Sequence, residues 1–231
     1  MSTQPFAGDK KFGTSILHKP EQAFIRFAVP KVPLWISTSQ LTYSTIVWSL
    51  GIIVASYFAN TNINWLWLVS FCIFLQWLTD SLDGAVGRSR NTGLVKWGYY
   101  MDHLLDYFFL CAIIIGYTLI LPPSFNILML FVLAIFSGFM INSYLSFAAT
   151  NRFQITYLGI GPTEIRLLFI MINTLLIFFG KTHLAFSLPY LLVFSLIGIL
   201  IVISKTSKEL WQMDMEHKQI QEHQNTKNPL T

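Results

Sequence analysis

The chain has 231 residues, of which 54% are hydrophobic and only 11% are charged. Soluble globular domains carry about 25% charged residues, so this composition excludes an ordinary water-soluble fold. The formal net charge of +4 does not indicate nucleic-acid binding, because the basic residues are distributed as expected for a membrane protein.

Residues 1–36 are predicted to form a cytoplasmic arm with one short amphipathic helix. Residues 1–20 lack the continuous apolar core of a secretory signal, so we expect the first spanning helix to direct insertion. Glu21 to Val29 mixes apolar and charged residues, and Pro30 ends any helix begun there. The pattern predicts an interfacial helix on the cytoplasmic leaflet, with an irregular solvated arm as the alternative.

Six apolar stretches follow, and each approaches the ~20 residues that a transmembrane helix needs. They are Leu41–Ala59, Trp65–Val86, Trp97–Leu121, Phe125–Thr150, Thr163–Gly180 and His183–Ser204. Asn, Gly and Pro residues punctuate the connections between them. The sequence therefore predicts an all-α, polytopic membrane protein, with a domain that is a bundle of six transmembrane helices over residues 37–204. Residues 205–231 are polar and are predicted to be a cytoplasmic tail, a helical extension that frays at its end.

Basic residues predict the orientation of the bundle, because Lys and Arg near membrane segments favour the cytoplasmic side. Of the 15 Lys and Arg residues, 14 lie in the N-terminal arm, in two connections on the same side of the membrane as that arm, or in the tail. Lys181 alone lies on the opposite side. We therefore expect both termini and the connection around residues 88–96 to face the cytoplasm.

Four aspartates lie within the predicted membrane segments, in two pairs. Asp80 and Asp83 are spaced i, i+3 near the end of the second stretch, and Asp102 and Asp106 are spaced i, i+4 near the start of the third. A carboxylate at the centre of a membrane helix costs about 2.5–3.5 kcal/mol and needs a compensating partner. The short connection predicts antiparallel neighbours, so we expect the four carboxylates to lie at the same depth. Carboxylate oxygens suit Mg²⁺, Mn²⁺ or Ca²⁺, and four of these groups are enough to bind two ions. Solvation, or pairing with the basic residues of the 88–96 connection, is the alternative.

These aspartates belong to a longer motif. It reads Asp80-Ser-Leu-Asp83-Gly84-Ala-Val-Gly87-Arg88, nine residues, then Gly98-Tyr-Tyr-Met-Asp102-His-Leu-Leu-Asp106. This resembles the class I signature of the CDP-alcohol phosphatidyltransferases, D-x-x-D-G-x-x-A-R, eight or nine residues, G-x-x-x-D-x-x-x-D. Seven of its eight fixed positions match over 27 residues, and the one departure is Gly87, where the family usually has Ala.

The resemblance implies a reaction and a role for each matched residue. The implied reaction transfers a substituted phosphate from a CDP-linked donor to an alcohol hydroxyl and releases CMP. By resemblance, Asp80, Asp83 and Asp102 ligate metal, while Asp106 borders the metal site and acts as general base. The implied CDP pocket consists of Asp80, Asp83, Gly84, Arg88 and Gly98. A homodimer, embedded in membrane lipid, is implied in the same way.

Four further residues are candidates for the acceptor site: His103, Glu164, Arg166 and Arg152. His103 follows the third aspartate, as a histidine does in the choline and ethanolamine phosphotransferases of this family, although a packing role is equally compatible. Glu164 and Arg166 open the fifth stretch on the expected cytoplasmic side. The alternative for Glu164 is structural, with Thr163 capping that helix and Glu164 favoured by its dipole.

The identities of the donor and the acceptor alcohol are left open by the sequence. The short chain resembles prokaryotic members that transfer a phosphatidyl group from CDP-diacylglycerol to a polar alcohol in phospholipid synthesis, and we expect that donor. The Met101-Asp102-His103 sequence favours the alternative, transfer from CDP-choline or CDP-ethanolamine to diacylglycerol. A cation transporter that uses intramembrane carboxylates is a different class of function, but it leaves Gly84, Arg88 and Gly98 unexplained.

Overall fold

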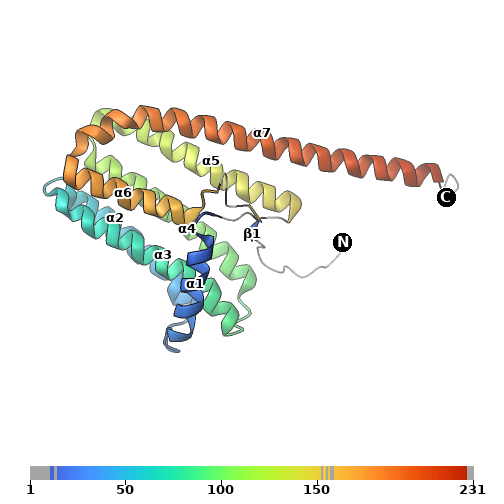
Figure 1. Ribbon diagram of the computed structural model, residues 1–231, viewed down its shortest axis with the longest axis horizontal. Helices are drawn as coiled ribbons and strands as arrows, with labels where there is room; N and C mark the ends of the chain where they lie inside the picture. The colour runs from blue at the N-terminus through green and yellow to red at the C-terminus, as the bar shows by residue number, and fades with distance from the viewer. Residues whose placement is uncertain (1–10, 13–14, 152, 155, 157–158, 228–231) are drawn as a thin grey trace.

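The computed structural model describes residues 11–12, 15–151, 153–154, 156 and 159–227. Seven α-helices account for most of these residues, and six of them are long and apolar enough to cross a membrane (Figure 1). The only strands among the described residues are β1 (Lys11–Phe12) and β2 (Phe153–Gln154), which pair in parallel over two residues. The predicted all-α, multi-pass membrane fold is confirmed.

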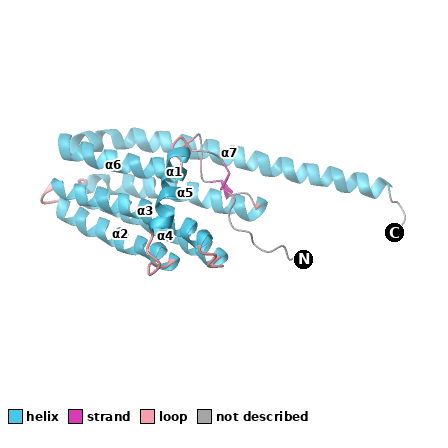
Figure 2. Cartoon of the chain, turned by 60° about the horizontal axis from the view of Figure 1, so that its bottom comes forward, coloured by secondary structure: helices cyan, strands magenta, loops and turns pink. Residues whose placement is uncertain are grey.

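The short helix α1 (His18–Ala28) precedes the bundle, as predicted for the N-terminal arm. The six long helices are α2 (Thr38–Ala59), α3 (Leu66–Ser89), α4 (Val95–Ile120), α5 (Asn126–Thr150), α6 (Pro162–Phe179) and α7 (Lys181–Lys227). The 3-10 turns are η1 (Val29–Lys31), η2 (Ile63–Trp65) and η3 (Pro123–Phe125). Successive long helices are joined at alternate ends of the bundle, by short connections except between α5 and α6, where the segment that contains β2 intervenes (Figure 2). The end of α3 and the start of α4, which carry the aspartates, therefore meet at the same end.

The helix ends follow the local chemistry of the sequence. Ser37 and Gln40 form a capping box at the start of α2: Ser37 Oγ accepts from the Gln40 amide at 3.2 Å, and Gln40 Oε1 accepts from the Ser37 amide at 2.7 Å. Gly93 and Gly180, which follow α3 and α6, have φ angles of +72° and +76°. Residues other than glycine are strained at positive φ. Glycine at these two positions therefore allows the tight turns that make the flanking helices neighbours.

Small residues let α2 pack closely against α3 and α4. A Cβ added to Gly116 of α4 would lie 2.5 Å from Oγ of Ser56 in α2, and one added to Gly51 would lie 2.9 Å from Sγ of Cys72 in α3. Lipid supplies little hydrophobic driving force between membrane helices, so close backbone approach through small residues is how they associate. The packing fixes α3 and α4, which carry the aspartates, relative to α2.

A buried polar cluster joins α3, α4 and α6 toward the end of the bundle away from the aspartates. The fully buried Asn173 donates from Nδ2 to Oγ of Ser70 at 3.1 Å and accepts at Oδ1 from the Tyr117 hydroxyl at 2.9 Å. Hydrogen bonds between side chains hold helices together where no water competes. This cluster therefore sets the position of α6 beside α3 and α4.

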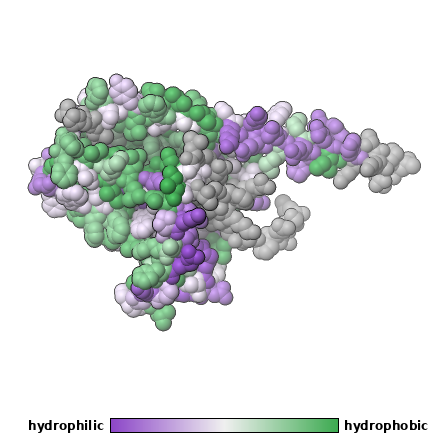
Figure 3. Space-filling model, in the orientation of Figure 1, coloured by the Kyte–Doolittle hydropathy of each residue, from purple (hydrophilic) through white to green (hydrophobic). Residues whose placement is uncertain are grey.

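The last helix, α7, extends well beyond the bundle. It is continuous over 47 residues, about 70 Å at 1.5 Å per residue, whereas the hydrocarbon core of a bilayer is about 30 Å thick. The span predicted to end at Ser204 thus continues as one helix to Lys227. Polar surface covers its distal half and the region around α1, while apolar surface covers much of the bundle (Figure 3).

Candidate active site

Three of the four motif aspartates converge where α3 ends and α4 begins. One carboxylate oxygen from each of Asp80, Asp102 and Asp106 lies within 4.8 Å of the other two, and all three residues are half-buried. Their positions follow from the sequence: the i, i+4 pair shares one face of α4, and the short connection turns that face toward α3. Oxygen donors grouped in this way fit a hard divalent cation such as Mg²⁺ or Mn²⁺.

Asp83 faces a different neighbour. Its Oδ2 accepts a 2.8 Å hydrogen bond from Thr42 Oγ1 of α2, and its Oδ1 accepts from the Gly84 amide. Asp83 is 7% exposed and lies outside the group of three converging aspartates among the described residues. The spacing within the motif gives no sign of this contact, because Thr42 is 41 residues away. The role of Asp83 as a metal ligand stays a prediction.

A buried arginine from α6 contacts two of the converging carboxylates. Arg166 Nη2 donates to Asp80 Oδ2 and to Asp106 Oδ1, in both cases at 3.0 Å. Arg166 is 6% exposed and lies over the Phe109 ring, with 5.6 Å from Cζ to the ring centroid. The structure thus shows that this residue contacts the aspartates, while the acceptor-site role suggested by the sequence stays a prediction.

Gln76 completes the cluster and has no place in the sequence motif. The fully buried Gln76 side chain accepts from Arg166 Nε at 2.6 Å through Oε1, and its Nε2 lies 3.5 Å from Asp106 Oδ1. Gln76 precedes Asp80 by one helical turn, so both project from one face of α3. A polar residue at i−4 to a motif aspartate, within an otherwise apolar stretch, is the signal that would have identified it.

Comparison with known families agrees with this arrangement. The family model for CDP-alcohol phosphatidyltransferase matches residues 35–204. The chain belongs to this family. The match covers all of α2 to α6, and therefore every residue of the carboxylate cluster. A comparison with curated proteins gives no match. Membership of the CDP-alcohol phosphatidyltransferase family makes the chain one of a class of membrane transferases with a CDP-alcohol donor and an alcohol acceptor.

Gly84 and Arg88, which the family signature assigns to the nucleotide, are exposed near the end of α3. A Cβ on Gly84 would lie 3.3 Å from Arg88 Nη1, so the guanidinium lies against the bare glycine backbone. Gly98 is not closely packed, because a Cβ added there would have no described atom outside its own helix backbone and chain neighbours within 4 Å. The close contact is at Gly87, where a Cβ would lie 3.2 Å from Thr38 Cγ2 of α2.

Glu164 accepts hydrogen bonds from two backbone amides, and its role in the acceptor site stays a prediction. Its Oε1 accepts from the Leu17 amide at 2.8 Å, and its Oε2 accepts from the Gly161 amide at 2.9 Å. Gly161 is the N-cap of α6, so the prediction that Thr163 caps this helix is wrong. Thr163 instead accepts a 3.3 Å hydrogen bond from Trp77 Nε1 of α3. These contacts anchor the start of α6 and hence the position of Arg166.

His103 is packed among aromatic rings beside Asp102. Its Nδ1 lies 3.4 Å from Asp102 Oδ2, and its ring stacks on Phe153 at 4.6 Å and on Tyr144 at 5.5 Å between centroids. The His103 side chain is only 11% exposed, which favours the packing role over contact with an acceptor. The remaining acceptor candidate, Arg152, lies outside the described residues.

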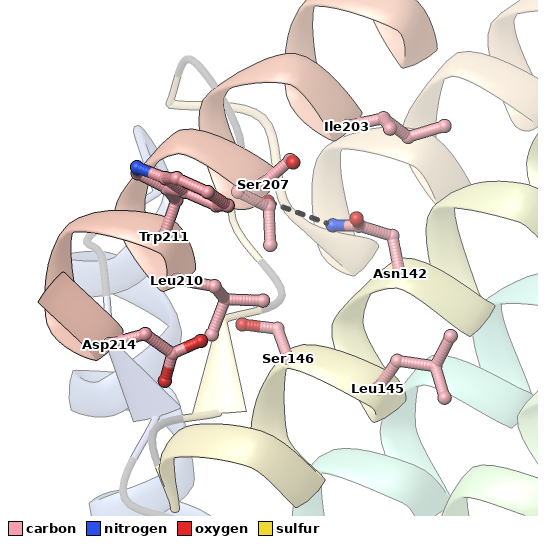
Figure 4. Close-up of a pocket in the computed structure, with 9 residues that line it drawn as sticks. Asn142, Leu145, Ser146, Ile203, Ser207, Leu210, Trp211 and Asp214 are labelled. Atoms are coloured by element: carbon pink, nitrogen blue, oxygen red, sulfur yellow. Dashed lines mark hydrogen bonds between the residues drawn. The ribbon is translucent and has the colours of Figure 1, made fainter.

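A separate cavity of about 370 Å³ lies between α5 and α7 (Figure 4). Its lining is Asn142, Leu145, Ser146, Ile203, Thr206, Ser207, Leu210, Trp211 and Asp214. Across the cavity Asn142 Nδ2 donates to Thr206 Oγ1 at 3.3 Å. The predicted catalytic, metal-binding and nucleotide-binding residues are absent from this lining, so the cavity is distinct from the carboxylate cluster.

Proposed function

We propose that this protein transfers a substituted phosphate from CDP-diacylglycerol to an alcohol hydroxyl and releases CMP in phospholipid synthesis, using Mg²⁺ or Mn²⁺. Family membership supplies the reaction class. The observation that carries the proposal is the convergence of Asp80, Asp102 and Asp106 from two helices to within 4.8 Å, where the family signature requires its metal ligands.

The carboxylates of Asp80, Asp102 and Asp106 would hold the metal, with Asp83 as a fourth ligand where two ions bind. Bound divalent ions neutralise charge on the diphosphate and on the leaving phosphate as the bond to it breaks. Gly84 lacks a side chain at an exposed turn of α3, so a nucleotide can approach the backbone there. Arg88 presents a fork of donors suited to phosphate oxygens at the same place.

Asp106 is the proposed general base. Its Oδ1 accepts from Arg166 Nη2 at 3.0 Å, which holds one carboxylate oxygen in place. In the proposed step the acceptor hydroxyl gives its proton to the Asp106 carboxylate. The hydroxyl oxygen forms a bond to the phosphorus distal to cytidine, and the bond from that phosphorus to the bridging oxygen breaks. CMP leaves with the electron pair of the broken bond.

The structure bears on the choice of donor through His103. This residue prompted the alternative of an aminoalcohol phosphotransferase, yet its side chain is packed between Tyr144 and Phe153. A packed histidine gives no support to recognition of an aminoalcohol, so CDP-diacylglycerol is the proposed donor. The excess of basic residues at the end of the bundle that carries the aspartates supports a cytoplasmic active site. The homodimer is proposed from the family resemblance.

The decisive experiment is a screen for CMP release by the purified full chain in detergent. Each donor, CDP-diacylglycerol, CDP-choline or CDP-ethanolamine, is incubated with Mg²⁺ or Mn²⁺ and either a panel of polar alcohols or diacylglycerol. We expect release only from CDP-diacylglycerol with one polar alcohol, and none in EDTA. Asp102→Asn should abolish release, and the matched control Asp214→Asn on the α7 extension should not.

The other outcomes of this screen are equally informative. CMP release from CDP-choline or CDP-ethanolamine with diacylglycerol would assign the aminoalcohol reaction instead. Divalent-ion flux into vesicles containing the protein, without CMP release from any donor, would support a transporter and contradict the proposal.

A further inference from the structure

The cluster at the ends of α3 and α4 contains more negative than positive charge. Asp80, Asp102 and Asp106 bring three carboxylates together, and Arg166 brings one guanidinium that contacts two of them. Arg166 is nine-tenths buried, so its charge is compensated by these carboxylates and not by water. Removing one partner of a buried ion pair is costly because the other charge is left uncompensated.

Groups other than the carboxylates also hold the guanidinium in place. Nε donates to Gln76 Oε1 at 2.6 Å, and the Phe109 ring lies beneath Cζ at 5.6 Å. The first turn of α6 is itself anchored by Glu164 and by the hydrogen bond from Trp77 to Thr163. Arg166 is therefore held at the carboxylates by several contacts of the fold besides the two ion pairs.

We propose that Arg166 is a resident counter-cation of the metal site, which balances Asp80 and Asp106 in the metal-free protein and competes with the metal for their oxygens. The inference rests on the metal-dependent function proposed above. Arg166 acts through the aspartates and is thus a positioning residue. Because like charges repel, a guanidinium 3.0 Å from two ligand oxygens lowers the affinity of those oxygens for a divalent cation.

The proposal predicts that removing Arg166 raises the affinity for metal, whereas other roles of Arg166 predict no change or a decrease. If Arg166 only contacts the acceptor alcohol, its removal changes the KM of that alcohol and leaves metal affinity unchanged. If Arg166 only holds the aspartates in a binding geometry, its removal weakens metal binding. A counter-cation is distinguished by the opposite result, in which its removal destabilises the metal-free protein and strengthens metal binding.

The test uses the full chain in detergent and Mn²⁺ alone as the probe. Free Mn²⁺ is measured by its electron paramagnetic resonance signal, and thermal unfolding is followed with and without Mn²⁺. In Arg166→Met we expect a lower unfolding midpoint without metal, a larger rise in midpoint on adding Mn²⁺, and a Kd for Mn²⁺ lower by about five- to tenfold. Arg166→Lys keeps the charge and should return the Kd to within about twofold of the wild-type value.

Arg90→Met is the matched control. Arg90 also donates to half-buried partners, from Nη1 to the Ile36 carbonyl at 2.5 Å and from Nη2 to the Val32 carbonyl at 2.9 Å, but these bonds tie the end of α3 to the segment before α2. Its substitution should lower the unfolding midpoint and leave the Kd for Mn²⁺ unchanged. A general loss of stability is thereby separated from a change in charge at the metal site.

Each remaining outcome decides the proposal. Unchanged or weaker Mn²⁺ binding by Arg166→Met overturns it, as does a variant that stays unfolded at saturating Mn²⁺. A variant that folds only with Mn²⁺ supports it, since the metal then replaces the missing charge. Wild-type protein that binds no Mn²⁺ overturns both this inference and the metal dependence proposed above. Mn²⁺-dependent CMP release by the wild type, with unchanged Mn²⁺ affinity in Arg166→Met, overturns the counter-cation alone.

Discussion

Two polar clusters join the same three helices, α3, α4 and α6, near opposite ends of the bundle. The neutral cluster consists of Ser70, Tyr117 and Asn173. The charged cluster consists of Gln76, Asp80, Asp106 and Arg166. Each cluster takes side chains from all three helices, so both cross-link the same elements. They differ in net charge and in the solvent exposure of their side chains.

The side chains of the neutral cluster hydrogen-bond to one another. Asn173 is fully buried and uses both its donor and its acceptor within the cluster, so no ligand is needed to stabilise it. In the charged cluster the side chains of Asp80 and Asp106 are 19% and 25% exposed, and their negative charge exceeds that of the guanidinium they share. A polar cluster that is closed and balanced serves the fold, whereas one that is accessible and unbalanced can bind a cation and a substrate.

The largest effect is expected for Asp106→Asn in the charged cluster. The amide keeps the size of the side chain and an oxygen that accepts from Arg166, so the protein should fold. It cannot take a proton from the acceptor hydroxyl, and CMP release should fall by about a thousandfold. Single-turnover CMP release and the thermal unfolding midpoint check the two halves of this prediction. Normal turnover in this variant would remove Asp106 from the role of base.

Asp80→Asn should have the next largest effect, on metal binding. The substitution removes one of three converging carboxylates and one of the two that contact Arg166. We expect the Kd for Mn²⁺ to rise by about tenfold or more. Titration of Mn²⁺ with the full chain in detergent measures it, and Asp214→Asn serves as the control on an aspartate outside the cluster. Equal Mn²⁺ affinity in the two variants would show that Asp80 is no ligand.

Asn173→Leu tests the neutral cluster and should affect stability alone. The substitution breaks hydrogen bonds to Ser70 and Tyr117 and leaves their hydroxyls buried. Interhelical hydrogen bonds contribute about 0.6–1.7 kcal/mol each, so we expect a loss of about 1–3 kcal/mol in the free energy of unfolding. The Kd for Mn²⁺ should stay unchanged at temperatures where the variant is folded. A changed Kd would mean that the two clusters are coupled through α6.

The contrast between the clusters also explains what the sequence could predict. The bounds of the first five spans lie within three residues of those in the structure, because apolar runs and Gly, Pro and Asn breaks follow from elementary helix chemistry. The convergence of Asp80 with Asp102 and Asp106 was also predictable, since helical spacing and a short connection fix it. These features depend on residues close together in the sequence.

What the sequence did not reveal depends on contacts between distant residues. Gln76 and Arg166 are 90 residues apart, and no spacing rule places a polar residue of α6 on a face of α3. The same holds for Asp83, which is drawn toward Thr42, and for Glu164, which accepts from Leu17. The neutral cluster escaped prediction for this reason too, because single Ser, Tyr and Asn residues in three apolar stretches carry no motif.

The smallest effect is expected for Tyr117→Phe, which removes one hydroxyl from the neutral cluster. Tyr117 donates to Asn173 Oδ1 at 2.9 Å, whereas the bond from Asn173 Nδ2 to Ser70 does not involve it. The hydroxyl also lies 3.3 Å from the Phe169 carbonyl, but its single proton is shared between the two acceptors. The ring keeps its packing against Phe169, so the free energy of unfolding should fall by about 1 kcal/mol or less. Denaturant unfolding of this variant and of Asn173→Leu, measured together, gives the comparison. A loss in Tyr117→Phe as large as that in Asn173→Leu would mean that the Tyr117 hydroxyl, and not the Asn173 amide, holds the three helices together.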